Sequence, residues 1–132
     1  AIHDFAVPLL HAGNDFAAYN AAVRDFAAEK IVELDLASAS QLETAEGRRD
    51  LTNRYMPHGV SHFLGLDVHD VGLAQGAIKT GMVLTCEPGL YIKEEGIGIR
   101  LESDIWVTDD GPVNLTAEIP MDVGEIEALM NK

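Results

Sequence analysis

Apolar residues recur at every third or fourth position through the first third of the chain, a spacing typical of helices. The first such stretch covers residues 2 to 12 and ends at Gly13. Pro8 lies inside it and should kink the helix or delay its start, because proline removes a backbone hydrogen bond. The pattern therefore predicts a distorted helix, with His3 and His11 as surface residues.

A longer helix is predicted from Asn14, a residue type that caps helix N-termini well. Charged residues lie mostly off its apolar face, which is formed by Phe16, Tyr19, Val23, Phe26 and Leu34. Aromatic stripes at this spacing usually belong to a core, so we assign them no catalytic role. A third helix is predicted from Ser40, where Glu43 completes a capping box, to Leu51.

After Gly72 the pattern becomes typical of strands. Residues 82 to 87 are rich in strand formers and stop at the turn signal Pro88-Gly89, which predicts Glu87 at a strand end. A turn is predicted at residues 109 to 111, and a short final helix after Asp122.

Residues 97 to 108 have the clearest alternation of the chain and predict one continuous strand. One face carries Ile97, Ile99, Leu101, Ile105 and Val107, and the other carries Arg100, Glu102 and Asp104. Arg100 and Glu102 should therefore point the same way.

The composition narrows the class of protein. Of 132 residues, 47% are hydrophobic and 23% charged, as in a soluble globular domain. The net charge of −13 argues against binding nucleic acid or an anionic membrane through a basic patch, and no apolar run approaches the roughly 20 residues that span a bilayer. A single cysteine forms no internal disulfide, so we expect a cytoplasmic protein.

Candidate chemistry is concentrated in residues 55 to 72, YMPHGVSHFLGLDVHDVG, which hold three of the five histidines: His58, His62 and His69. Glu87 and Glu102 follow in the strand-like region. Imidazole and carboxylate groups together suit divalent ions such as Mn²⁺, Zn²⁺, Co²⁺ or Fe²⁺, and one carboxylate can bridge two ions. The residue types thus indicate a metal site.

Spacing alone leaves other interpretations open. Glu102 could simply pair with Arg100 or face water. His69 could form an ordinary imidazole–carboxylate pair with Asp67 or Asp70, which lie close to it in the sequence.

Three blocks resemble the C-terminal half of the catalytic domain of aminopeptidase P, the Xaa-Pro aminopeptidase of the pita-bread metallopeptidases. They are MPHGVSHFLGLDVHDVG, GMVLTCEPGLYI and GIGIRLESDIWVT, in the family's order. The resemblance implies an α+β fold with helices packed on a curved antiparallel sheet. It also implies a dinuclear metal site, with manganese the first expectation, and a peptide substrate with proline at its second position.

By this resemblance His62, Glu87 and Glu102 match three metal ligands, with Glu102 bridging two ions and Glu87 also acting as general base. His58 and His69 match histidines that position substrate, and Arg100 matches an arginine beside the last ligand. Tyr91 is expected to line the pocket or pack beneath it.

The chain departs from the family pattern before the first histidine block. Two ligand aspartates are expected upstream, and residues 1 to 54 hold no such block. We therefore expect residues 1 to 132 to form a partial peptidase domain that holds one ion or none and is inactive alone. Apolar surface that normally meets the other half would favour a homo-oligomer.

Two other functions remain open at this stage. A prolidase, which cleaves Xaa-Pro dipeptides, shares the histidine and EPG blocks, although the short connection from Tyr91 to Gly98 favours aminopeptidase P. A non-enzymatic relative could keep the fold as a peptide- or protein-binding module, but three intact ligand residues argue against it.

Overall fold

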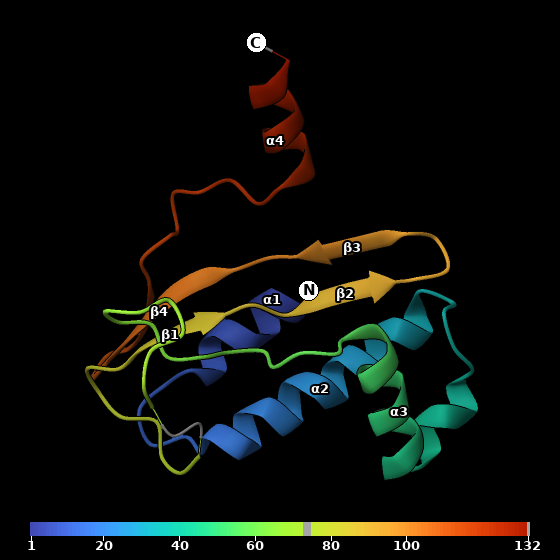
Figure 1. The fold of residues 1–132 in the computed structure, drawn as a ribbon, viewed down its shortest axis with the longest axis horizontal. Helices are drawn as coiled ribbons and strands as arrows, with labels where there is room; N and C mark the ends of the chain where they lie inside the picture. The colour runs from blue at the N-terminus through green and yellow to red at the C-terminus, as the bar shows by residue number, and fades with distance from the viewer. Residues whose placement is uncertain (73–74, 132) are drawn as a thin grey trace.

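A computed structural model describes residues 1–72 and 75–131. The helical first part contains α1 (Ile2–Ala6), α2 (Phe16–Glu33) and α3 (Ala45–Tyr55), with 3-10 turns at Val7–Leu9 and Ala39–Glu43. The strands follow as β1 (Val83–Cys86), β2 (Gly89–Ile92), β3 (Ile97–Arg100), β4 (Ser103–Thr108) and β5 (Gly111–Asn114), and then α4 (Val123–Met130). The predicted mixed helix and antiparallel-sheet class is confirmed (Figure 1).

The strands form two antiparallel sheets, β1-β4-β5 and β2-β3. The segment 60–64 runs along the other edge of β1. Three backbone hydrogen bonds hold it there. The Glu87 N–H donates to the Val60 carbonyl (2.9 Å), the Thr85 N–H donates to the His62 carbonyl (2.9 Å), and the Leu64 N–H donates to the Val83 carbonyl (3.1 Å). This pairing fixes the histidine segment beside β1, although only the Phe63–Leu84 position forms a β-bridge.

The core lies between α2 and the strands. Tyr19 and Val23 of α2 are fully buried, as are Leu84 of β1 and Ile105 and Val107 of β4, and all belong to one cluster. The α2 stripe was therefore predicted correctly at its start. Leu34 departs from it, because α2 ends at Glu33 and the Leu34 side chain is 58% exposed.

Helix boundaries differ from the predictions by a few residues. Asp15 caps α2 in place of Asn14, since its carboxylate accepts from the N–H groups of Ala17 and Ala18. The helix predicted from Ser40 instead begins after Thr44, whose hydroxyl accepts from the Gly47 N–H. Over residues 2 to 12, the α-helix ends at Ala6 and continues as the 3-10 turn that contains Pro8.

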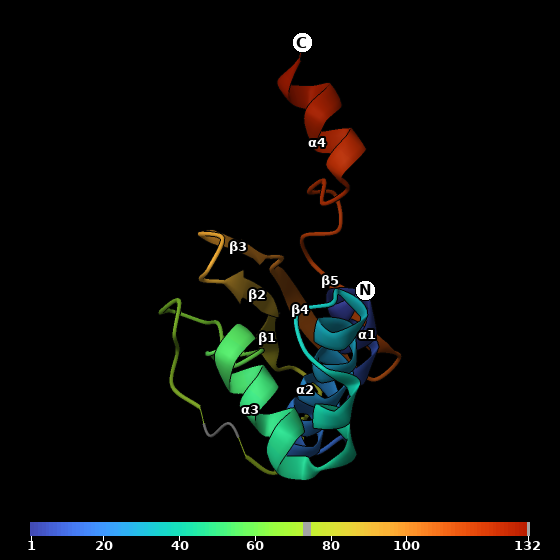
Figure 2. The ribbon, with the colours of Figure 1, turned by 90° about the vertical axis from the view of Figure 1, so that its right-hand side faces the viewer.

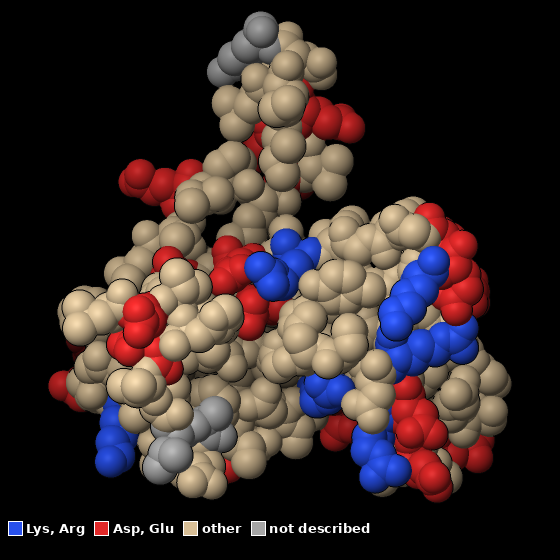
Figure 3. Space-filling model, in the orientation of Figure 1, with Lys and Arg blue, Asp and Glu red and all other residues tan. Residues whose placement is uncertain are grey.

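Helix α4 stands away from the rest of the molecule (Figures 1 and 2). Asp122 caps it as predicted, accepting from the Glu125 N–H at 3.1 Å. Its surface in Figure 3 is largely uncharged with some acidic groups, and its exposed apolar side chains are Val123, Ile126, Leu129 and Met130. In the described part of the chain, no helix is both long and apolar enough to cross a membrane.

Two buried ionisable side chains, Tyr19 and Cys86, should make the free energy of unfolding depend on pH in the alkaline range. Burial raises the pKa of the Tyr19 phenol above its usual range and that of the Cys86 thiol to about 12. Unfolded, these groups ionise near about pH 10 and 8.5. The folded state therefore keeps protons that the unfolded state releases, and stability should fall as pH rises above about 8.5, by up to about 1.4 kcal/mol per pH unit for each group.

Urea unfolding at pH 8 and pH 10 measures this loss. Replacing Cys86 by alanine should remove about 2 kcal/mol of the difference, because the thiol of the unfolded chain accounts for most titration in that interval. An equal pH dependence in the two proteins would contradict the assignment.

Candidate metal centre

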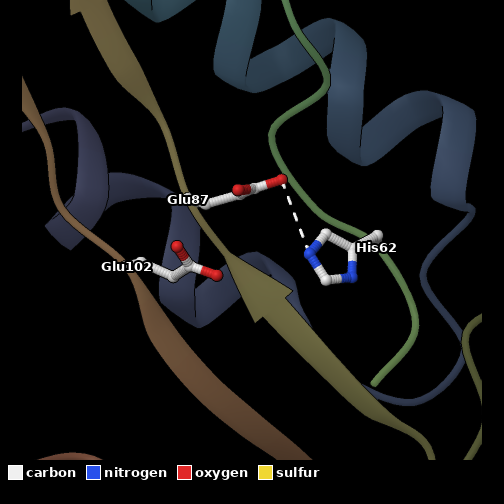
Figure 4. A group of neighbouring side chains, drawn as sticks. All are labelled: His62, Glu87 and Glu102. Carbon is white, nitrogen blue, oxygen red and sulfur yellow. Dashed lines mark ion pairs between the residues drawn. The ribbon is translucent and has the colours of Figure 1, made fainter. Parts of the chain in front are cut away.

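Glu87 and Glu102 lie directly opposite each other, Glu87 just after β1 and Glu102 just before β4. Cys86 pairs with Ser103 at the end of the β1–β4 ladder, and Gly89 pairs with Arg100 at the start of the β2–β3 ladder. The same register runs through both ladders, β1–β4 and β2–β3. In the gap between them it therefore places Glu87 opposite Glu102. Because the Cys86 and Ser103 side chains are buried in the core, alternation directs the two carboxylates to the other face (Figure 4).

This gap corrects the prediction of one strand over residues 97 to 108. Like charges directly opposite each other destabilise a ladder, and the strand is interrupted at Leu101 and Glu102. Only its second part keeps the predicted burial, since Ile97 and Ile99 are 49% and 64% exposed.

Arg100 offsets the repulsion between the two carboxylates. Its guanidinium Nη1 lies 3.4 Å from Glu87 Oε2, and Nη2 lies 3.1 Å from Glu102 Oε2. The predicted proximity of Arg100 and Glu102 is therefore present in the structure. The Glu87 side chain is mostly buried, whereas that of Glu102 is 35% exposed.

His62 approaches the same place from the segment beside β1. Its backbone N–H donates to the hydroxyl of buried Thr85 at 2.9 Å. Its ring Nδ1 lies 2.9 Å from the Phe63 carbonyl oxygen, and because a carbonyl only accepts, Nδ1 is the donor in this contact. Nε2 faces Glu87 Oε1 at 3.8 Å, the contact drawn in Figure 4.

These three side chains form a candidate site for a divalent metal ion. Their donor atoms all lie within 4.8 Å of one another, and they combine one imidazole with two carboxylates. Rigid neighbours hold two of the three, since Glu87 follows β1 directly and Thr85 fixes His62. Across residues 1–72 and 75–131, this is the one group of three or more such donors at ligand spacing.

His58 lies next to Gly89, two residues after Glu87, and is held from two sides. Its Nδ1 lies 2.6 Å from the Gly59 carbonyl oxygen, so Nε2 accepts from the Tyr91 hydroxyl at 2.9 Å. Arg24 donates to the His58 carbonyl at 3.3 Å. Tyr91 therefore orients His58. The sequence predicts only that Tyr91 lines the pocket or packs beneath it, and does not predict this contact.

The His69 ring lies tilted against that of His62, with 4.4 Å between the ring centroids. The Asp70 carboxylate, considered above as its partner, accepts instead from the N–H groups of Leu66 (3.1 Å) and Val71 (2.8 Å). The structure thus places His69 against the candidate ligand.

Gly89 makes room for the His58–Tyr91 pair. A Cβ there would lie 2.8 Å from the Tyr91 hydroxyl and 2.9 Å from His58 Nε2. Replacing Gly89 by alanine should break this hydrogen bond and cost about 1–3 kcal/mol through overpacking. The ¹⁵N shift of His58 Nε2 should move to its value in a Tyr91→Phe variant.

The matched control is Gly59→Ala, where the nearest atom to a new Cβ is 3.9 Å away. An unchanged His58 Nε2 shift in Gly89→Ala would show that the pair tolerates the methyl group.

The chain belongs to metallopeptidase family M24, whose model matches residues 1–109. Among curated proteins it is 37% identical to the Xaa-Pro aminopeptidase of Haemophilus influenzae, over 96% of this chain and 32% of that protein. It is 50% identical to the Xaa-Pro aminopeptidase of Escherichia coli over 88 residues, 58% of this chain and 20% of that protein. The resemblance recognised in the three sequence blocks is confirmed.

Solved structures agree with this assignment. Zinc-substituted aminopeptidase P from E. coli, in complex with product, superimposes with a TM-score of 0.85 at 35% identity. The match covers 98% of this chain and 32% of that one, which supports the predicted pita-bread fold. The chain spans about a third of the length of these relatives.

Proposed function

We propose that this chain contributes to a metal-dependent aminopeptidase that cleaves the peptide bond before a proline at the second position of its substrate. The observation that carries the proposal is the convergence of His62, Glu87 and Glu102 at the gap between the two ladders. The relatives named Xaa-Pro aminopeptidase support the choice of substrate.

In this proposal the three residues are metal ligands. His62 would offer the Nε2 lone pair, because the bond from Nδ1 to the Phe63 carbonyl orients the ring with Nε2 toward Glu87. Glu87 and Glu102 would offer carboxylate oxygens, and Glu102 would take the bridging role that the resemblance implies. Bound divalent ions would lower the pKa of a water molecule and polarise the carbonyl of the bond to be cleaved.

The other residues act on the peptide and on protons. Glu87 has a second carboxylate oxygen that can accept a proton from the attacking water. His69 packs against His62, and His58 lies next to Gly89; both would orient the substrate through hydrogen bonds. Arg100 holds both carboxylates in one place, so their orientation depends on it.

Three ligands fall short of the set that two ions require. We propose that this 132-residue polypeptide alone binds one ion weakly and does not turn over peptide. Manganese is our first choice, with zinc, cobalt and iron compatible with the same donors. We further propose a cytoplasmic site of action, supported by the free cysteine, and self-association through exposed apolar surface such as that of α4.

A chimera tests the function. The segment of E. coli Xaa-Pro aminopeptidase that matches this chain is replaced by residues 1 to 132, and release of the first residue from a peptide with proline second is measured with Mn²⁺. We expect turnover, and its loss in the His62→Ala chimera but not in the His11→Ala chimera.

Each other outcome has a definite meaning. Turnover that survives His62→Ala would disprove the ligand assignment. A folded, metal-loaded chimera that cleaves no proline-containing peptide would disprove the proposed substrate class.

A further inference from the structure

His3 is a buried histidine that the mechanism above does not use. It belongs to α1, is only 8% exposed, and was predicted to be a surface residue, which the structure shows to be wrong. Its Nε2 lies 3.0 Å from the hydroxyl oxygen of Ser103, which is 100 residues away in the sequence and 1% exposed. A buried imidazole with a polar partner so distant in sequence calls for a physical reason.

The contact continues into a network whose donors and acceptors are all consistent. Asn114 Nδ2 donates to Ser103 Oγ at 3.3 Å, which leaves the Ser103 proton for Nε2 of His3. Asn114 Oδ1 accepts from both the N–H and the hydroxyl of Thr116, each at 2.9 Å. The Thr116 hydroxyl oxygen accepts in turn from the Asp104 N–H at 3.3 Å.

The proton on His3 can be assigned from the same contacts. Nδ1 faces a carboxylate oxygen of Asp4 at 3.7 Å, which favours the proton on Nδ1. Nε2 is then an acceptor, as the Ser103 hydroxyl requires. His3 therefore completes the network at the α1 side.

This network holds the residue next to a candidate metal ligand. Ser103 directly follows Glu102, and its pairing with Cys86 is the last one before the ladder opens at the two carboxylates. Glu102 itself lies outside the strands, so the backbone on its C-terminal side is fixed by Ser103 and Asp104. Both of these residues are bonded into the network.

We propose that His3 is a positioning residue for Glu102: the His3–Ser103–Asn114 network holds the start of β4 so that the Glu102 carboxylate stays within reach of His62 and Glu87. The inference rests on the proposed function, because it assigns the network a role in metal binding. Groups that orient metal ligands typically contribute about 10- to 100-fold to metal affinity.

A purely structural role makes a different prediction. If His3 only filled space beneath the sheet, an apolar residue of similar size would keep metal affinity unchanged. A positioning role requires an acceptor at Nε2. Glutamine can place an amide oxygen there, whereas leucine cannot.

The test compares His3→Leu and His3→Gln with the unmodified chain, with His11→Ala as a histidine control outside the network. Mn²⁺ affinity is measured by calorimetry, and exchange of the Asp104 amide proton by NMR. We expect His3→Leu to weaken Mn²⁺ binding about 10-fold and to speed Asp104 exchange, and His3→Gln to restore both. Exchange of the Val107 amide proton should be unchanged, because this N–H donates to the Met82 carbonyl at 2.9 Å, toward the other end of β4.

The outcomes separate this inference from the proposed function. Equal Mn²⁺ affinity in His3→Leu and the unmodified chain would overturn the inference, as would affinity that His3→Gln fails to restore. Absence of Mn²⁺ binding in the unmodified chain would overturn both the ligand assignment and the role of His3 in it, and Asp104 exchange would then report only on folding.

Discussion

Replacing Glu87 by glutamine should weaken binding of Mn²⁺ by at least about 100-fold. Residues that merely orient ligands contribute about 10- to 100-fold, so loss of an anionic ligand should reach or exceed the top of that range. Glu87 is also the more buried of the two carboxylates, and its backbone N–H donates to the Val60 carbonyl at 2.9 Å. Isothermal titration calorimetry on the purified chain measures the affinity.

The matched control is Glu118→Gln, which removes the same charge from an exposed position. Its Mn²⁺ affinity should equal that of the unmodified chain. An equal drop in both variants would mean that net charge, and no specific ligand, controls binding.

Thermal unfolding gives a second measurement of metal binding by the Glu87→Gln variant. At a concentration of 100 times its dissociation constant, a ligand stabilises the folded state by about 2.7 kcal/mol. The unmodified chain should gain this stability and Glu87→Gln should not. Without metal the two should unfold at similar temperatures, because the substitution removes the repulsion from Glu102 along with the contact to Arg100.

The candidate site was predictable from the sequence to the extent that local pattern determines it. The strand-former run ending at Pro88-Gly89 located Glu87 at a strand end, and β1 does end at Cys86. Alternation put Arg100 and Glu102 on one side, where they now form an ion pair. The convergence of His62, Glu87 and Glu102 supports metal binding, and the Glu87→Gln prediction tests it.

What the sequence missed depends on contacts between distant segments. The break at Glu102 follows from the carboxylate opposite it, which becomes visible only when the register of both ladders is known. The sequence predicts His3 at the surface because α1 has too few residues for its pattern to show which face Ser103 would cover. It predicts Asn14 as the helix cap in place of Asp15 because both residue types cap helices and only backbone geometry decides between them.

The two faces of β1 differ in what they contact. Leu84 and Cys86 belong to the hydrophobic core cluster, whereas Thr85, which is also buried, and Glu87 contact His62. Changes on the core face should lower the free energy of unfolding. Changes on the site face should act mainly on metal affinity.

Replacing Tyr19 by alanine should therefore have the largest effect on stability, about 3–5 kcal/mol. Tyr19 is fully buried between α2 and β1, packs edge-on against Phe16 with 6.0 Å between ring centroids, and its hydroxyl lies 3.9 Å from Cys86 Sγ. The neighbouring backbone cannot collapse into the space of a whole ring, so a cavity remains. Because domains of this size are stable by about 5–15 kcal/mol, much of the total would be lost.

Urea unfolding measures this loss, with Tyr19→Phe as the control that keeps the ring. At 3.9 Å the hydroxyl makes only a weak contact with sulfur, so Tyr19→Phe should cost less than about 1.5 kcal/mol. A similar loss in both variants would mean that the hydroxyl, and not the ring, stabilises this contact between α2 and β1. If Tyr19→Ala still folds at low temperature, its three candidate ligands are intact, and Mn²⁺ affinity should decline far less than in Glu87→Gln.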